Sequence, residues 1–538
     1  MKYSSLKEVV DLVMLRDIQV EALEETKKAI MEDGKTCIML DLPTGSGKSI
    51  VCLQICDYYK KNINGKAKVD LLTCSKMLQT QYFEEFDFIN NLWGKANYRC
   101  DKFNCDCELG KDMCDMNKVK CEDCPYDTAM KNWKSGDISL TNFHLFDMYS
   151  IFVPAILDQR QANLLIIDEA HNFEELFSDF ISVSVSYRYL KRFKLPAERL
   201  AFYERNLPDL DKIGPFIKML TENISPDIRR VVTEMQEAIK TDATVVKDYL
   251  KLIRDGNGFL DKIQYFVEQY EADPDNWVLE QQYNSHNEIS IIAEPVWSAE
   301  YLRQLVWSKY KHVILMSGTM LDKKMFSKLM GVDVEKTHWI SIPSPFPVEN
   351  RQIYYMPIGK MTKDNKTIAF QDMVPYIKKV LKKYKDHKGI IHTNTYELSN
   401  WIRDEIKDDR LIFHTSQNRD EALFMHQKSK KPTILVSPSM NTGIDLKDDL
   451  SRFQIIIKMP YPSLGSKKVK RRLELNPDWY NWKTVADLVQ TYGRSIRSET
   501  DWAETFIMDA SFSTVRQRSI KFIPKYMLEA IVYMNVTT

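Results

Sequence analysis

Short apolar runs of four to eight residues recur along the chain and alternate with amphipathic stretches. The first group comprises TCIMLDL, VDLLTCS, NLLIIDEAH and HVILMSGTM, and the second, after residue 388, comprises GIIHTNT, LIFHTS, TILVSPS, FQIIIKM and TFIMDA. Runs of this kind are typical of parallel strands that are buried on both faces and connected by crossover helices. Two groups therefore predict an α/β protein with two parallel-sheet domains.

The segment between Phe173 and about Val296 follows a different pattern. It contains long charged stretches with helical periodicity, such as DIRRVVTEMQEAIKTDATVVKDYLKLIRD, and no apolar run of comparable strength. We interpret it as a helical insertion. Farther on, the segment SIPSPFPVENRQ carries prolines at 343, 345 and 347, which interrupt any regular element. This segment is predicted to mark the boundary between the two α/β domains.

The bulk composition restricts the class of protein. A chain of 538 residues is too long for one ordinary core, and its 75 Lys and Arg residues are balanced by 75 Asp and Glu residues. Any nucleic-acid groove must therefore be locally basic. The first residues lack a secretory signal pattern, and no run of about 18 apolar residues follows. We expect no membrane segment and a cytoplasmic protein, acting in a host cytoplasm if it is virus-encoded.

The segment DLPTGSGKS at positions 41–49 lies between the apolar run TCIMLDL and the amphipathic IVCLQICDYYKK. A glycine turn in this context binds phosphate, because backbone N–H groups and a helix N-terminus both face the anion. Lys48 would pair with the β- and γ-phosphates, and the Ser49 hydroxyl would hold Mg²⁺. A turn that only joins strand to helix is disfavoured, since residue types and context agree. The predicted ATP and Mg²⁺ site comprises Thr44, Gly45, Ser46, Gly47, Lys48 and Ser49.

The run NLLIIDEAH places two carboxylates at the end of an apolar strand. We expect Asp168 to hold Mg²⁺ through water and Glu169 to orient and activate the attacking water. His171 alone would more often be a satisfied core histidine, but within this tetrad we favour coupling to the later SGT segment at 317–319.

In the second group of strands, QTYGRSIR carries Gln490, Arg494 and Arg497 at helical spacing. Phosphoryl transfer requires positive charge at the γ-phosphate, so the two arginines are candidate catalytic groups. The alternative is a solvated basic helix face, which the accompanying phosphate loop and acidic site disfavour.

Six of the ten cysteines lie between Cys100 and Cys124. A cytoplasmic compartment disfavours disulfides, so this group is predicted to bind a metal. The pair Cys121 and Cys124 has C-x-x-C spacing, which suits zinc, but four thiolates also suit an iron-sulfur cluster. Residue types alone leave both metals open.

With DEAH, SGT and QxxGRxxR in this order, the sequence resembles the superfamily 2 helicases, and more closely the XPD/DinG family of iron-sulfur DNA helicases. R-x-x-Q precedes the phosphate loop, and TCSKMLQTQ is similar to motif Ia, TNFHLF to the segment before DEAH, and SPSMNTGIDL to motif V. KMPYPSL and NPDWYNW are similar to the family's C-terminal end. Leu42 departs from the strict phosphate-loop pattern, as is common in helicases.

The resemblance implies an ATP-dependent 5′-to-3′ DNA helicase that translocates on single-stranded DNA and acts on forked or partly duplex DNA. It further implies a monomeric motor, whose protein partners the sequence does not identify. The implied nucleotide contacts include Arg16, Gln19, Gly443 and Asp445. The implied DNA contacts are Thr73, Ser75 and Gln81.

For the cysteines, the resemblance implies a 4Fe-4S cluster rather than zinc, because the group lies between motif Ia and DEAH. NYRC and CPY resemble the first and last cluster ligands. The expected ligands are Cys100, Cys114, Cys121 and Cys124, with Cys105 as the substitute.

The resemblance also implies a domain layout with two RecA-like domains. Residues 1–95, 138–175 and 296–345 would form the first, 96–137 the iron-sulfur insertion, 176–295 a helical arch, and 346–538 the second.

The run KKVKRR at 467–472, followed by Trp479, Tyr480 and Trp482, has the composition of a nucleic-acid contact. A solvated charged surface fits it equally well. Among functions, a translocase without unwinding activity, a nucleotide-switched nucleic-acid clamp and a metal-binding scaffold with a vestigial ATPase remain alternatives to the helicase. Intact Glu169 and Arg494 argue against the clamp.

Overall fold

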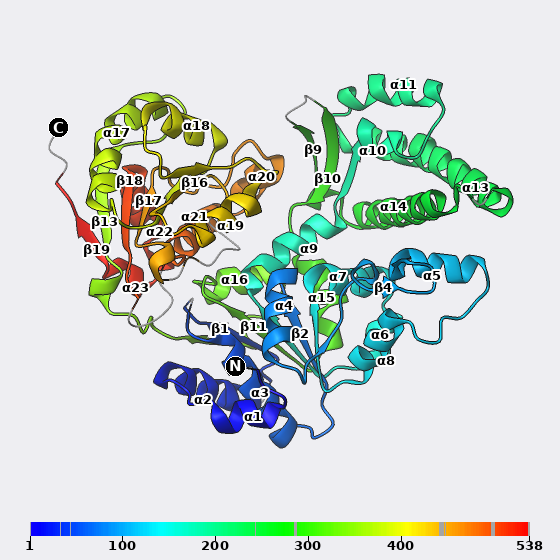
Figure 1. Cartoon of the computed structure of the whole chain (residues 1–538), viewed down its shortest axis with the longest axis horizontal. Coiled ribbons are helices and arrows are strands. Elements are labelled where there is room, and N and C mark those ends of the chain that lie inside the picture. Colours follow the sequence, from blue (N-terminus) through cyan, green and yellow to red (C-terminus); the bar gives the residue numbers. More distant parts are fainter. Residues whose placement is uncertain are drawn as a thin grey trace.

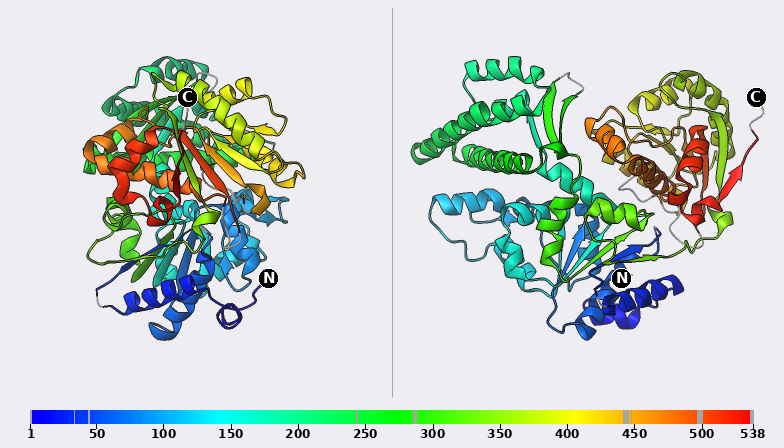
Figure 2. Two further views of the ribbon diagram at one scale, coloured as in Figure 1. Left: turned by 90° about the vertical axis from the view of Figure 1, so that its left-hand side faces the viewer. Right: turned by 180° about the vertical axis from the view of Figure 1, so that it is seen from behind.

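The computed structural model describes residues 2–32, 34–43, 45–242, 244–284, 288–440, 446, 448–495 and 501–535 (Figure 1). Two parallel sheets lie side by side, and a largely helical insertion stands above the first of them (Figure 2). The predicted fold class, an α/β protein with two parallel-sheet domains, is confirmed. Among the described helices, none is long and apolar enough to cross a membrane.

The first sheet has seven parallel strands, in the order β12-β1-β11-β7-β2-β6-β3. Alternate side chains of its central strands enter two different cores, as the pleat requires: Ile38 and Leu40 face one, and Met39 faces the other. The strands are β1 (Cys37–Asp41), β2 (Val69–Thr73), β3 (Asn90–Asn91), β6 (Ile138–Asn142), β7 (Leu164–Asp168), β11 (His312–Ser317) and β12 (Thr337–Ser341).

Helices cover both faces of this sheet, which explains the continuous apolar runs in its strands. Residues of α1, α2 and α3 contribute to one core, and residues of α7, α9 and α15 contribute to the other. The helices of this domain are α1 (Leu6–Leu12), α2 (Asp17–Met31), α3 (Lys48–Asn62), α4 (Lys76–Glu85), α7 (Phe143–Phe152), α8 (Ala155–Arg160), α9 (Phe173–Ile181), α15 (Ala299–Leu305) and α16 (Lys323–Met330).

The chain passes to the second sheet between Ser341 and Ile353, through the proline-rich segment. This sheet also has seven parallel strands, in the order β15-β16-β14-β17-β18-β13-β19. The strands are β13 (Ile353–Gly359), β14 (Gly389–His392), β15 (Leu411–Phe413), β16 (Ile434–Ser437), β17 (Phe453–Ile456), β18 (Glu504–Asp509) and β19 (Ile531–Tyr533). The helices are α17 (Lys366–Lys383), α18 (Tyr396–Glu405), α19 (Arg419–Lys428), α20 (Lys467–Leu475), α21 (Pro477–Tyr492), α22 (Ser511–Ser519) and α23 (Lys525–Leu528).

The insertion after α9 is not wholly helical, which corrects the expectation from sequence. An antiparallel sheet in the order β8-β10-β9 forms its root. Buried and partly exposed residues alternate along β10, so this strand contains no continuous apolar run that would mark it in the sequence. The elements are β8 (Val183–Ser186), α10 (Tyr187–Lys191), α11 (Ala197–Asn206), α12 (Ile213–Lys218), α13 (Ser225–Thr241), α14 (Val246–Ala272), β9 (Trp277–Tyr283) and β10 (Ile289–Pro295).

A second insertion, between β3 and β6, carries the cysteine group. It contains β4 (Arg99–Cys100), β5 (Cys105–Asp106), α5 (Cys107–Met116) and α6 (Pro125–Ser135). The two insertions touch: Arg254 of α14 lies 3.1 Å from Glu108 and also pairs with Asp112, both on α5. The cysteine segment is therefore held between the first sheet and the helical insertion.

A fully buried arginine joins the first sheet to its neighbouring segments. Arg160 forms an ion pair with Asp70 of β2 and donates to the carbonyl oxygens of Trp133 (2.7 Å), Gly136 (2.9 Å) and Val69 (2.8 Å). Tyr310 donates to the other Asp70 oxygen at 2.7 Å. The buried charge is thus fully hydrogen-bonded.

Replacing this arginine is expected to destabilise the first domain strongly. Arg160→Met leaves the Asp70 carboxylate buried without its counter-charge, and we expect a loss of about 3–5 kcal/mol in the free energy of unfolding. Urea titration followed by circular dichroism measures it. Arg303→Met is the control, because Arg303 forms an exposed pair with Glu300 whose loss costs less than about 1 kcal/mol. Equal losses in the two variants would contradict the assignment.

Candidate active site

The phosphate loop connects the end of β1 to the start of α3 at Lys48. Gly45 and Gly47 have φ angles of 80° and 79°, in the left-handed region that favours glycine. A Cβ at Gly47 would also lie 2.3 Å from Nε2 of Gln19. The backbone conformation therefore favours glycine at both positions, and a side chain at Gly47 would displace the Gln19 amide. The turn presents the α3 N-terminus to an anion. Thr44 lies outside the described residues.

Arg16 and Gln19 brace this loop from α2. The Gln19 amide donates to the carbonyl oxygen of Ser46 at 2.9 Å, and Arg16 donates to that of Gly45 at 3.0 Å. The Gln19 side-chain oxygen accepts from the Arg16 backbone N–H at 2.9 Å, which fixes the orientation of its amide. The structure therefore places both predicted nucleotide-binding side chains on the loop backbone.

The acidic pair lies at the end of β7. Asp168 is buried and accepts hydrogen bonds from the Tyr82 hydroxyl at 3.0 Å and the Glu169 backbone N–H at 2.9 Å. Burial, together with the Glu169 charge, raises the pKa of Asp168 above its ordinary value. Glu169 lies 3.4 Å from the ammonium of Lys48. The lysine of the phosphate loop and the candidate base thus neutralise one another.

The donor set suits a hard divalent cation. Ser49, in the first turn of α3, offers a hydroxyl oxygen, and Asp168 offers a carboxylate oxygen, the ligand types that Mg²⁺ prefers. Both belong to elements that end or begin at the same edge of the sheet.

His171 connects the two domains. Its Nδ1 lies 2.8 Å from the Ser317 hydroxyl, and its Nε2 accepts from the Gln490 amide at 3.1 Å. Because Nε2 accepts, the proton of the neutral ring lies on Nδ1, which faces the Ser317 hydroxyl and also lies 3.3 Å from the Glu169 carboxylate. Burial lowers the pKa of His171 to about 4, which keeps the ring neutral. Gln490 also donates to the Thr319 hydroxyl at 2.7 Å.

Arg494 lies one helical turn after Gln490 and bonds to it twice. Its Nε donates to the Gln490 backbone carbonyl at 3.1 Å, and its Nη2 donates to the Gln490 side-chain oxygen. The guanidinium is therefore held to the residue that contacts His171. The other predicted residues of this domain, Arg497, Gly443 and Asp445, lie outside the described residues.

Two contacts were not predicted from the sequence. Tyr82 is buried on α4 and holds Asp168, yet nothing in the run TCSKMLQTQYF distinguishes it from an ordinary core tyrosine. Trp482 of α21 donates from its indole N–H to the backbone oxygen of Met320 at 2.8 Å, directly after SGT. The conspicuous aromatic run NPDWYNW is the only signal that could have indicated it.

The three predicted DNA contacts are not equally accessible. Thr73 is fully buried at the end of β2, and its hydroxyl donates to the Ser75 backbone oxygen at 3.4 Å. Ser75 caps α4 by accepting from the Leu78 N–H at 3.2 Å. Gln81 is exposed on α4. Of the three, Gln81 therefore offers the side chain most directly to solvent.

The six clustered cysteines lie near one another. Cys100 is opposite Cys105 across β4 and β5, and Cys107 is hydrogen-bonded to Cys124. Cys100 also lies near Cys107 and Cys114, and Cys114 lies near Cys121. Burial raises the pKa of Cys107 to about 11 and also raises the pKa of Cys105 and Cys114. A Cβ at Gly110 would lie 2.7 Å from the Cys100 sulfur, so glycine allows α5 to approach it.

The thiols suit a soft metal or cluster in type and number. Within the described residues, however, no three Cys, His, Asp or Glu side chains are arranged to hold one metal ion.

These features define a class of protein. Strands β1, β11 and β7 are neighbours, so the glycine loop, the SGT segment and the acidic pair meet at one edge of a parallel sheet, where a second parallel-sheet domain adds Gln490 and Arg494. This is the architecture of a nucleoside triphosphatase built from two RecA-like domains.

Comparisons with known proteins specify the class further. Residues 363–528 match the family model of the helicase C-terminal domain, and residues 12–202 match that of the type III restriction enzyme res subunit. The ATP-dependent DNA helicase DinG of Photobacterium profundum is 22% identical over 488 residues, which cover 74% of this chain and 69% of that protein. DinG of Escherichia coli K12 is 24% identical over 255 residues, which cover 43% of this chain and 35% of that protein.

Solved structures show the same fold. An XPD helicase has a TM-score of 0.64 at 14% identity, over 97% of this chain and all of that one. The structure of S. tokodaii Xpd4 has a TM-score of 0.57 at 16% identity, with the same coverage. The family models and the DinG relatives support the resemblance to XPD/DinG-type superfamily 2 helicases, and the solved structures show the same fold. The resemblance found in the sequence is thereby confirmed.

The brace on the phosphate loop predicts a specific defect. Gln19→Ala removes the donor to the Ser46 carbonyl, so the loop is less ordered before phosphate arrives, and we expect the Kd for ATP to rise about tenfold. Titration with a fluorescent ATP analogue measures this change. Gln81→Ala, at an exposed position of α4, serves as the control and should bind ATP normally. An unchanged Kd in Gln19→Ala would show that the brace is dispensable.

Proposed function

We propose that this chain is an ATP-dependent DNA helicase that translocates 5′ to 3′ on single-stranded DNA and hydrolyses ATP between its two RecA-like domains. The observation that carries this proposal is the hydrogen-bonded chain from Ser317 through His171 to Gln490 and Arg494. It connects the SGT segment of one domain to the arginine of the other, and its His171 also lies 3.3 Å from Glu169 of the acidic pair. A site divided in this way changes when the domains move, as a motor requires.

The phosphate loop and its lysine bind the nucleotide. The γ-phosphate of ATP competes with Glu169 for Lys48, which lies 3.4 Å from that carboxylate in this structure. Once Lys48 turns to the phosphates, Glu169 can accept a hydrogen bond from the attacking water and take its proton. Ser49 and Asp168 would hold Mg²⁺, which when bound neutralises charge on the phosphate oxygens.

The second domain supplies positive charge to the transition state. Arg494 has a guanidinium held by Gln490, and Arg497 follows it in the same motif. Charge that develops on the γ-phosphate oxygens is stabilised when this domain closes. His171 stays neutral and relays the position of Gln490 to the acidic pair through its contacts.

We propose single-stranded DNA and forked or partly duplex DNA as the substrates, and a monomeric motor. The DinG relatives are named as DNA helicases, which supports DNA as the polymer. Around motif Ia, Ser75 and Gln81 lie where a backbone could be gripped without base readout. We propose that Thr73 acts through the loop it stabilises.

The motor assignment predicts separable defects. Lys48→Ala should abolish ATP binding and strand separation, whereas Glu169→Gln should retain binding and lose turnover. Arg494→Ala should lower turnover by about 10³-fold while the Kd for ATP changes little, since its charge acts in the transition state. ATP turnover with and without single-stranded DNA, measured beside strand displacement on a fork, tests these values. Strand separation by Lys48→Ala or Glu169→Gln would refute the proposal.

We further propose that the cysteine segment holds a 4Fe-4S cluster through Cys100, Cys114, Cys121 and Cys124. Six thiols in one short insertion, four of them buried, support this assignment in donor type and number. Because burial favours protonated thiols, cluster binding must release protons, and the segment would be ordered by the cluster.

Anaerobic purification followed by iron and zinc analysis and a visible spectrum tests the metal. We expect a brown protein that loses iron in Cys124→Ser and retains it in Cys107→Ser. A colourless protein with stoichiometric zinc would refute the cluster. Loss of iron in Cys107→Ser but not in Cys114→Ser would refute the choice of ligands.

A further inference from the structure

The basic run KKVKRR forms helix α20, and two of its charges are buried. Lys468 and Arg472 are 8% and 5% exposed, whereas Lys467 and Lys470 are exposed. The buried residues are four positions apart, so they lie on one face of the helix. That face meets the first domain, and it is unavailable to a nucleic-acid backbone.

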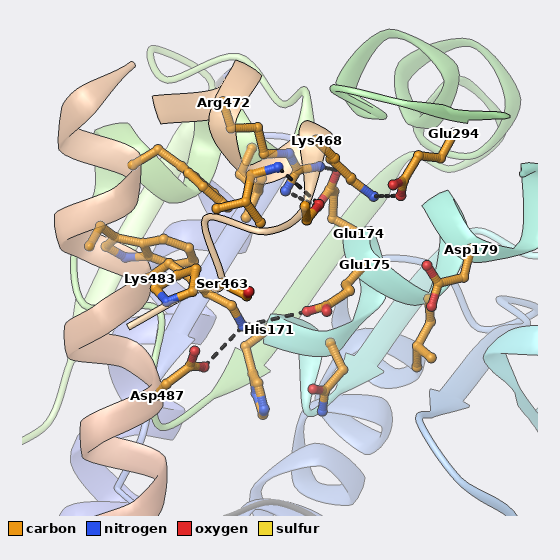
Figure 3. Close-up of a pocket in the computed structure, with 18 of the residues that line it drawn as sticks. His171, Glu174, Glu175, Asp179, Glu294, Ser463, Lys468, Arg472, Lys483 and Asp487 are labelled. Atoms are coloured by element: carbon orange, nitrogen blue, oxygen red, sulfur yellow. Dashed lines mark hydrogen bonds and ion pairs between the residues drawn. The ribbon is translucent and has the colours of Figure 1, made fainter. Parts of the chain in front are cut away.

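Arg472 is held by partners from two segments of the first domain and one element of its own. It lies 2.6 Å from Glu174 of α9 (Figure 3). Its Nε donates to the carbonyl oxygen of Val296, directly after β10, at 2.5 Å. Its guanidinium carbon lies 4.7 Å from the ring centroid of Trp297 and 5.0 Å from that of Trp479, and the two rings are perpendicular to one another. A carboxylate, a carbonyl and two aromatic faces together satisfy the buried charge.

Lys468 extends the contact to the root of the insertion. Its ammonium donates to the Ser178 hydroxyl of α9 at 2.6 Å and lies 3.3 Å from Glu294 of β10 (Figure 3). At the start of α20, the Lys467 backbone N–H donates to Glu280 of β9 at 3.2 Å. Helix α20 therefore contacts α9, β9 and β10.

This interface combines charged contacts at α20 with apolar packing at α21, where the rings of Trp482 and Phe326 lie 6.3 Å apart in a shared core. A cavity of about 570 Å³ opens between α9, the insertion root and helices α20 and α21. Beside it, Lys483 of α21 lies 3.4 Å from Glu175 and 3.0 Å from Asp487 (Figure 3). The charged contacts therefore lie around an open space, whereas the apolar packing holds α21 against the first domain.

Helix α21 connects this interface to the nucleotide site. Trp479, against Arg472, and Gln490, against His171, lie on the same helix, eleven positions apart, or roughly 16 Å along its axis. On the other side, Glu174 follows His171 by three residues. Movement of Gln490 during a nucleotide cycle therefore moves α21 as a rod and pulls on Arg472.

We propose that α20 is a strut through which the second domain moves the root of the helical insertion, with Arg472 and Lys468 as positioning residues. The proposal rests on the helicase function proposed above. It assigns to KKVKRR a mechanical connection in place of a nucleic-acid contact: nucleotide-driven domain movement passes along α21 to Arg472, then to Glu174 and the Val296 backbone, and so to β10.

The test compares Arg472→Met, which removes the charge, with Arg472→Lys, which retains it, and with Lys470→Met on the exposed face of α20. We expect Arg472→Met to keep basal ATP turnover and single-stranded DNA affinity within about twofold, and to lose about tenfold in strands separated per ATP hydrolysed. Arg472→Lys should lie between Arg472→Met and the unsubstituted chain. Lys470→Met should separate as many strands per ATP hydrolysed as the unsubstituted chain.

A double-variant cycle tests whether Arg472 and Glu174 act through one shared interaction or through two separate contacts. Arg472→Met combined with Glu174→Gln should separate strands no worse than the more severe single variant, because both remove one interaction. Additive losses would count against the strut. Melting temperatures show that each variant is folded, and Lys468→Met replaces Arg472→Met if the latter does not fold.

Hydrogen exchange provides a readout that does not depend on unwinding. With a non-hydrolysable ATP analogue, Arg472→Met should exchange faster than the unsubstituted chain in α9 and β10, with α3 unchanged. The strut would be overturned if Arg472→Met separated as many strands per ATP hydrolysed as the unsubstituted chain. It would also be overturned if the affinity of this variant for DNA fell as much as its unwinding. An unsubstituted chain without DNA-stimulated turnover would instead refute the helicase function, and the exchange experiment would still test the strut.

Discussion

The active site depends on the adjacency of three parallel strands, β1, β11 and β7. Parallel strands end at the same edge of a sheet, so the loops that follow these three meet there whatever their distance in sequence. The register of these strands also sets how far along each strand the site residues lie. Asp41 is paired with Ser317, and Met316 is paired with Asp168. Within the part of the chain that the structure describes, the second domain adds Gln490 and Arg494 to this edge.

Local patterns predicted the parts of this site that follow strand ends. DLPTGSGKS and NLLIIDEAH each combine an apolar run with a short chemical motif, and both elements form where the sequence indicates. The role of Gln19 was less accessible. Its bond to the Ser46 carbonyl depends on how α2 packs beside the loop, which no local pattern encodes. Tyr82 is a similar case, since its only sign of function is a carboxylate 86 positions away.

The charged run KKVKRR shows where sequence reasoning reaches its limit. The sequence does not distinguish a buried arginine from a solvated one. Arg472 is buried by its contacts with Glu174 and Val296, which lie 298 and 176 positions away in the chain. The antiparallel sheet of the insertion was missed for a related reason, because half-exposed strands alternate polar with apolar residues. The cysteines present a third form of the problem: their spacing reveals donor chemistry, but which sulfurs converge is decided by tertiary structure.

The contact between Lys48 and Glu169 has a consequence for the order of events in the site. The lysine and the carboxylate offset one another's charge, so a nucleotide phosphate must displace Glu169 from Lys48 before it can pair with the lysine. The same exchange turns the carboxylate away from Lys48 and makes it available to water. Phosphate binding and exposure of the base are thus one exchange of partners, which acts as an interlock between the two.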